Sequence, residues 1–95
     1  MDASQLVQIV RDRYGELEIE VKEIAVFKII TIDLTHDYKI TITHNSKNDS
    51  LKLQVRDVIE VYSLASMDEK LFHHRIFSTA LSANVPSDIM KPLMI

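Results

Sequence analysis

The stretch Glu16-Leu-Glu-Ile-Glu-Val-Lys22 alternates charged and apolar residues, and this alternation indicates the fold class. Successive side chains of an extended strand point to opposite faces, so the apolar residues share one face and the glutamates share the other. Three later segments also have strand patterns: residues 25–34, 38–43 and 51–56. Because short polar connectors join these three segments, neighbouring strands must run antiparallel. The pattern predicts a four-stranded antiparallel meander. Since residues 25–34 are apolar on both sides, their strand is expected to be central in the sheet or buried on both faces.

An amphipathic helix is predicted before the strands, from Asp2 to Tyr14. Asp2 is the expected N-cap residue, and Gln5 stands three residues later in the capping-box position. Gly15 is the only glycine in the chain. It follows the helix at a place where a positive φ angle is common. We therefore expect the first helix to end at Gly15.

Residues 57–64 fit two different structures. The alternation of the preceding strand could continue through Ile59 and Val61 as a further strand. Asp57 and Glu60, however, repeat the capping-box pattern. Helical spacing is also followed by the apolar residues Val58, Val61, Tyr62 and Ala65. We favour a short helix for this segment.

A longer helix is predicted near the C-terminus. Ser66 is its expected N-cap residue, and Asn84 stops it after about Ala83. The apolar stripes of the helices and the apolar faces of the strands must bury one another, which places the helices on one side of the sheet. The chain is therefore predicted to be a single two-layer α+β domain spanning residues 1–95, with residues 85–95 as an apolar C-terminal tail.

The residue types that build cofactor and metal sites are missing or badly spaced. The chain has no cysteine, which excludes thiol nucleophiles and cysteine-bound metals, and one glycine cannot form a phosphate-binding loop. His36 and His44 flank an extended segment, and the adjacent His73 and His74 diverge around a helix. We expect no cofactor, no metal site and no enzymatic activity.

The charge pattern and the hydrophobic pattern also limit the classes of partner that we expect. The formal net charge is −3, and no cluster of basic residues is strong enough to predict nucleic-acid binding. No apolar segment approaches the roughly 20 residues that cross a membrane, and the first residues lack the pattern of a signal peptide. We expect a cytoplasmic protein that binds neither membrane nor nucleic acid.

Glu16, Glu18 and Glu20 form an acidic strip along the first strand. Such a strip can dock a basic partner, but charges on an edge strand can also guard against aggregation or pair with lysines on the next strand. The last predicted strand carries Lys52 and Arg56, so the open sheet face is expected to run from acidic to basic. A face of this kind suits protein recognition.

The last helix has a second apolar sector. Phe77 and Leu81 lie outside the stripe that faces the sheet, so this sector needs a cover. The tail with Leu93 and Ile95, a neighbouring helix or a second subunit could provide it. If the sector binds a partner, truncation after Asn84 is expected to remove binding and leave the fold intact.

These surfaces predict a non-catalytic protein-interaction module, such as a small inhibitor or regulatory adaptor, whose partner is another protein. Its expected interaction residues are Glu16, Glu18, Glu20, Phe77, Leu81, Leu93 and Ile95. The element order in a short acidic chain resembles that of small inhibitors and accessory proteins of phages and mobile elements. A structural homodimer is the alternative, with Phe77, Leu81 and the tail buried between two chains. A small enzyme using His36 and Asp37 is less favoured.

Overall fold

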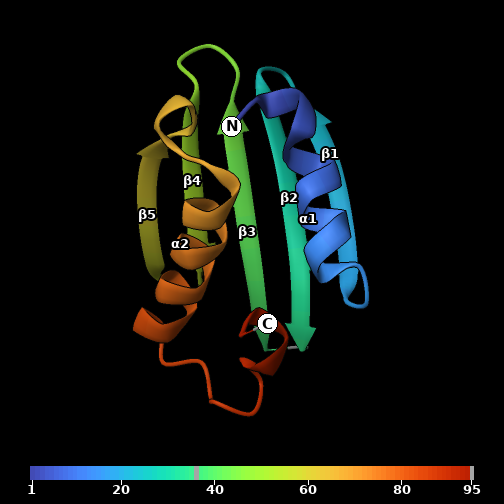
Figure 1. The fold of residues 1–95 in the computed structure, drawn as a ribbon, viewed down its shortest axis with the longest axis vertical. Helices are drawn as coiled ribbons and strands as arrows, with labels where there is room; N and C mark the ends of the chain where they lie inside the picture. The colour runs from blue at the N-terminus through green and yellow to red at the C-terminus, as the bar shows by residue number, and fades with distance from the viewer. Residues whose placement is uncertain (36, 95) are drawn as a thin grey trace.

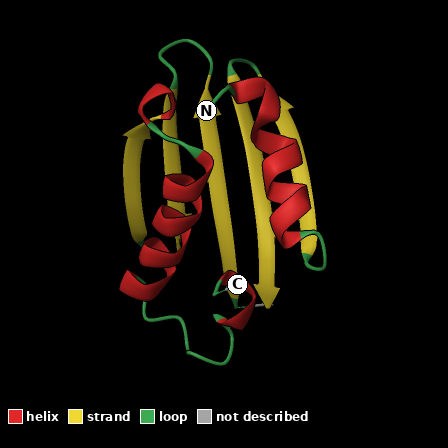
Figure 2. Cartoon of the chain, in the orientation of Figure 1, coloured by secondary structure: helices red, strands yellow, loops and turns green. Residues whose placement is uncertain are grey.

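The computed structural model describes residues 1–35 and 37–94, which form one antiparallel sheet with two α-helices on one of its faces (Figure 1). Figure 2 shows both α-helices in front of the strands, on the same face of the sheet. In chain order the elements are η1 (Ala3–Gln5), α1 (Leu6–Tyr14), β1 (Glu18–Ile24), β2 (Phe27–Thr35), β3 (Tyr38–Asn45), β4 (Ser50–Val55), β5 (Val58–Ser63), η2 (Leu64–Ser66), α2 (Glu69–Ser82) and η3 (Lys91–Leu93), where η marks a short 3-10 helix.

The described residues form five strands in the order β1-β2-β3-β4-β5, so the meander has one strand more than predicted. The short helix favoured for residues 57–64 is wrong, because Val58–Ser63 pairs with β4 as strand β5. A two-residue turn makes this pairing possible: Arg56 has a φ angle of 56°, as the first central residue of a tight hairpin turn requires. The strand then turns Val58 and Tyr62 toward the helices, so tertiary packing overrides the local helical spacing.

The core lies between the sheet and the helices. Its fully buried side chains include Leu6 and Val10 of α1, Phe72 and Ile76 of α2, Leu64 of η2, and Ile30, Ile32, Ile40, Ile42, Leu51, Leu53 and Val55 of the sheet. The opposite sheet face is open, and Phe27 on that face is exposed. Since β2 lies between β1 and β3 but is covered on one face only, its apolar pattern reflects an interior strand.

The helix ends differ in detail from the prediction. Asp2 caps η1 rather than a long α-helix, because its side chain accepts a hydrogen bond from the Ser4 amide at 3.0 Å. Gly15 has a φ angle of −64°, not a positive one. Glycine is required there for space, since a Cβ atom would overlap the carbonyl oxygen of Arg11. At α2 the N-cap residue is Asp68 instead of Ser66, and it accepts from the Leu71 amide at 2.7 Å.

The C-terminal segment folds back onto its own chain. Asn84 has a φ angle of 59°, which turns the chain away from the end of α2. The segment then returns below the helices (Figure 1), and Met90 and Leu93 are buried in the core. The tail therefore covers the protein's own apolar surface, while Leu81 of α2 and Met94 of the tail itself remain exposed.

Candidate functional site

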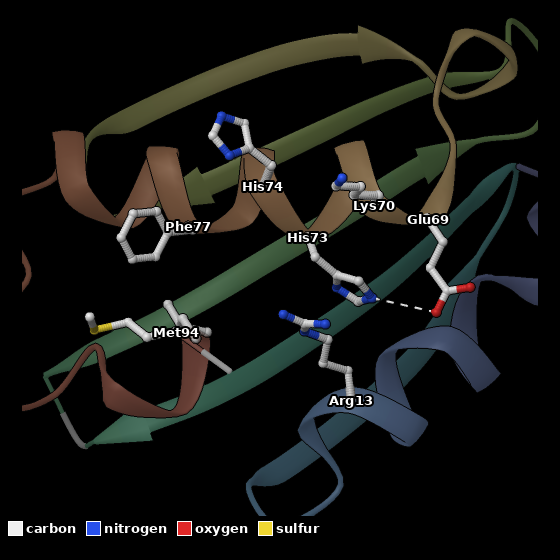
Figure 3. A pocket seen from close by; sticks show the side chains of 8 residues that line it. Arg13, Glu69, Lys70, His73, His74, Phe77 and Met94 are labelled. Carbon is white, nitrogen blue, oxygen red and sulfur yellow. Dashed lines mark ion pairs between the residues drawn. The ribbon is translucent and has the colours of Figure 1, made fainter.

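A groove of about 630 Å³ lies between the C-terminal end of α1, the side of α2 that faces α1, and the C-terminal segment (Figure 3). We call it the helix groove. Its lining residues come from three parts of the chain: Arg13, Glu69, Lys70, His73, His74, Phe77, Leu93 and Met94. Helical spacing explains the contribution of α2, because Glu69, His73 and Phe77 are four residues apart and lie on one side of the helix.

A buried hydrogen bond joins the two helices beneath the groove. The Tyr14 hydroxyl lies 2.9 Å from His73 Nδ1, and both side chains are buried. Burial raises the pKa of Tyr14 to about 12, so its hydroxyl keeps its proton at neutral pH. The positive charge of Arg13 opposes this rise in the pKa of Tyr14. We assign the Tyr14 hydroxyl as the donor and His73 Nδ1 as the acceptor of this hydrogen bond.

This arrangement determines which nitrogen of His73 carries hydrogen. Because Nδ1 accepts from Tyr14, the neutral ring carries its proton on Nε2. Nε2 is buried and has no hydrogen-bond partner within residues 1–35 and 37–94. The Glu69 carboxylate is 3.7 Å away, which is beyond hydrogen-bonding distance. His73 thus places an unsatisfied N–H donor beneath the lining of the helix groove.

Burial is the main reason that the pKa of His73 is lowered. The positive charge of Arg13 lowers the pKa further, and the nearby Glu69 carboxylate opposes both effects. His73 therefore stays neutral at pH values where an exposed histidine begins to take up a proton. A neutral histidine with Nε2 protonated is suited to hold a hydrogen-bond acceptor rather than to remove a proton from one.

The rim of the helix groove combines positive charge with an apolar wall. Arg13 and Lys70 supply two cations against the single carboxylate of Glu69. Phe77 is half-buried, and Met94 is 63% exposed on the opposite side. Figure 3 shows the Phe77 ring and the Met94 side chain on one end of the groove and the charged residues on the other. The groove therefore fits a ligand that is both acidic and apolar.

The predicted interaction residues do not form one surface. Glu18 and Glu20 lie on the open sheet face, as cross-strand neighbours of Asp33 and Thr31. Glu20 forms a surface ion pair of 3.2 Å with Lys22 of the same strand, and its cross-strand neighbour is Thr31 rather than a lysine. Glu16 precedes β1 and is exposed.

The other candidates lie on the helix side of the sheet. Phe77 lines the helix groove, and Leu81 is exposed one turn further along α2. Leu93 is only 3% exposed and belongs to the core, so its side chain is largely withdrawn from a partner. Ile95 lies outside the described residues.

Only one of the two residues that the less favoured enzymatic hypothesis uses lies within the described chain. Asp37 occupies the turn between β2 and β3, and His36 beside it is not among the described residues. Within the part of the chain that the structure describes, no group of three or more His, Cys, Asp or Glu side chains could hold a metal ion.

A second buried histidine has a structural role. His44 Nε2 lies 2.7 Å from Asp49 Oδ1 across the turn between β3 and β4. Asp49 has a φ angle of 57°, which is an uncommon conformation for a residue with a side chain. The hydrogen bond to His44 holds this turn closed.

Sequence reasoning missed the Tyr14–His73 pair. The two residues are 59 positions apart, and neither belongs to a motif. The available signal was weak: Tyr14 ends the apolar stripe of the first helix, and His73 separates the two apolar sectors of the last. Only the packing of α1 beside α2 brings them together.

Comparison of the chain with protein-family models, with curated proteins and with solved structures finds no significant match. No helix within the described ranges is long and apolar enough to cross a membrane.

Proposed function

We propose that this domain is a non-catalytic protein-interaction module, and that its helix groove binds an acidic segment of a partner protein that also carries an apolar side chain. The observation that supports this proposal is the buried, unsatisfied N–H of His73 beneath the lining of a groove whose rim carries Arg13 and Lys70. A carboxylate of the partner would lie near both cations, and it would accept from His73 Nε2 once the groove lining moves to uncover this buried atom. Through such binding the domain would act as a small inhibitor or regulatory adaptor.

The physical chemistry favours a protein segment over a small anion. The apolar wall of Phe77 and Met94 gives the groove a surface that an inorganic anion would leave unused. Methionine is flexible and polarizable, and it adapts to the shapes of different partner side chains. Since the chain as a whole is acidic, with a net charge of −3, the positive rim also distinguishes the groove from the rest of the surface.

The arrangement beneath the groove supports binding rather than catalysis. Tyr14 holds its proton at neutral pH, and its hydroxyl is hydrogen-bonded to His73. The lowered pKa of His73 makes it a weak base, and its accepting nitrogen is already bonded to Tyr14. Both groups are therefore suited to fixed hydrogen-bond geometry and poorly placed for proton transfer.

Selection of short peptides from a displayed random library, followed by fluorescence anisotropy with the selected peptides, tests this proposal. We expect enrichment of Asp or Glu next to Phe, Leu or Ile. Lys70→Glu should weaken binding about tenfold or more, because it places a negative charge beside the ligand carboxylate. Lys47→Glu is the matched control, since Lys47 is exposed in the turn between β3 and β4. Selected peptides without acidic residues, or equal losses in both variants, would contradict the proposal.

A further inference from the structure

The two edges of the sheet differ in how they are protected. The edge strand β1 carries charged side chains on both faces, with Glu18, Glu20 and Lys22 on the open face and Glu23 on the helix face. The edge strand β5 reads Val-Ile-Glu-Val-Tyr-Ser and has one charge in six residues. Its Ile59 and Val61 are 51% and 62% exposed. Natural sheets normally guard such edges with charge, and an unguarded edge of β-branched residues is ready to pair with another strand.

The backbone of β5 is also free to pair. In the tight turn that joins β4 to β5, the flanking residues Val55 and Val58 form the hydrogen-bonded pair. Hydrogen-bonded and non-bonded pairs alternate along an antiparallel ladder, so Ile59, Val61 and Ser63 direct their N–H and C=O groups away from β4. Within the described chain, no strand lies beyond β5 to receive them. The Ser63 carbonyl accepts one hydrogen bond from Ser66 Oγ and retains a second lone pair.

We propose that β5 pairs with β5 of a second copy of this chain, in a two-fold antiparallel dimer that joins two five-stranded sheets into one sheet of ten strands. This inference goes beyond the proposed binding function and does not depend on it. It also differs from the homodimer expected from the sequence, in which Phe77 and the C-terminal tail lie between the chains. The tail packs on its own chain and leaves β5 as the uncovered apolar edge.

Charge selects the register of the dimer. A two-fold axis at Glu60 would place two carboxylates directly opposite each other, which is destabilising. An axis at Val61 pairs Val61 with Val61 of the second copy, and it pairs Ile59 with Ser63 of the second copy. These are the residues whose backbone groups face outward, so this register also makes the most hydrogen bonds. It is therefore the favoured one.

The same register gives Glu60 a partner. With the axis at Val61, Glu60 lies opposite Tyr62 of the second copy, on the helix face of the joined sheet. The Arg75 guanidinium stacks over the Tyr62 ring at 5.2 Å, so Glu60 of one copy comes beside Arg75 of the other. Arg75 Nε is buried without a hydrogen-bond partner among the described residues, and Glu60 forms no ion pair with them. The two-fold axis produces this charge pair twice.

Sedimentation velocity and light scattering, measured from micromolar to about 1 mM protein, test the dimer. We expect the wild-type chain to associate into dimers over this range. Val61→Lys should raise the dimer dissociation constant at least about tenfold, because it places two like charges opposite each other at the axis. Val61 is exposed, so the monomer fold should survive, and circular dichroism checks this. The matched control is Ile24→Lys, which adds the same charge at a 57% exposed residue of the other edge strand and should leave association unchanged.

A charge exchange tests the register separately. Glu60→Arg alone should weaken the dimer, and Glu60→Arg combined with Arg75→Glu should restore it, since each new arginine then faces a glutamate of the other copy. A wild-type chain that remains monomeric at all concentrations would overturn the proposal. So would a dimer that survives Val61→Lys, or one that Ile24→Lys weakens equally. Failure of the double variant to recover association would overturn the register with Val61 on the axis.

Discussion

The most informative single residue is His73. Its protonation depends on its burial and on three neighbours, Tyr14, Arg13 and Glu69. Tyr14 fixes the tautomer through Nδ1, burial disfavours the charged ring, and Arg13 adds positive charge nearby. Glu69 is the one neighbour that favours the protonated form, and it is too distant to hydrogen-bond to Nε2. The balance leaves the His73 ring neutral, with its N–H donor beneath the helix groove. The burial of this neutral histidine must also appear in the pH dependence of stability.

We expect the free energy of unfolding to fall as the pH is lowered from about 7 to about 5. In the unfolded chain His73 takes up a proton near its ordinary pKa of about 6.5, whereas in the folded chain it stays neutral to lower pH. The unfolded state then binds more protons, so stability is complete above about pH 6.5 and is lost as the pH falls through this window. Urea denaturation at several pH values measures the slope.

Two variants assign the pH dependence to this residue. His73→Gln removes the titrating group and should flatten the profile between about pH 5 and 7. His74→Gln changes the neighbouring, exposed histidine and should leave the slope as in the wild type. Identical slopes in the wild type and His73→Gln would show that the pH dependence comes from another group.

At the scale of elements, boundaries are set by single side chains and by turns. Helix α2 illustrates this, because two residues compete for its start. Ser66 fits a capping box in the sequence, but its hydroxyl donates to the Ser63 carbonyl at 2.9 Å and closes η2. Asp68 adopts an extended backbone conformation and accepts the hydrogen bond from the Leu71 amide instead. Ser66 therefore belongs to the 3-10 turn after β5, so it does not serve as the N-cap residue of α2.

Asp68→Ala is expected to lower the free energy of unfolding by about 1 kcal/mol, the usual cost of removing an N-cap side chain. Ser66→Ala should change it by less than about 0.5 kcal/mol, because the lost hydrogen bond is exposed. Urea denaturation of both variants at neutral pH provides the comparison. A larger loss for Ser66→Ala would mean that the helix begins at the residue predicted from the sequence.

At the scale of the whole molecule, the C-terminal segment completes the core. Both helices lie on one face of the sheet, with α1 packed against β1 and α2 packed against β4 and β5. The segment that ends in η3 returns between the lower ends of the helices (Figure 1) and buries Met90 and Leu93. The truncation after Asn84 would therefore remove part of the core, and loss of partner binding in that variant would not by itself locate a binding surface.

Leu93→Ala is expected to cost about 2–5 kcal/mol of stability, as for other fully buried leucines. That is a large share of the roughly 5–15 kcal/mol that stabilises a typical small domain. Met94→Ala, one residue further on and largely exposed, should cost less than about 0.5 kcal/mol. Thermal or urea unfolding of the two variants measures the difference, and equal stabilities would mean that the segment does not pack on the core in solution.

The fold class and most of the elements can be predicted from the order of residues alone. Alternation in residues 16–22, 38–43 and 51–56 predicts strands because one side of each strand faces an apolar layer. The stripe ending at Tyr14 predicts a helix for the same reason. These patterns depend only on which side of an element is buried, so they can be detected without knowing what buries it.

The remaining features depend on contacts between distant parts of the chain. Residues 58–63 fit a helix or a strand locally, and pairing with β4 selects the strand. The helix groove depends on Tyr14 and His73, which are 59 positions apart, and on a tail that packs back onto its own chain. The physical reason is common to these cases: periodicity records that a side chain is buried, but the residue that buries it comes from elsewhere in the sequence.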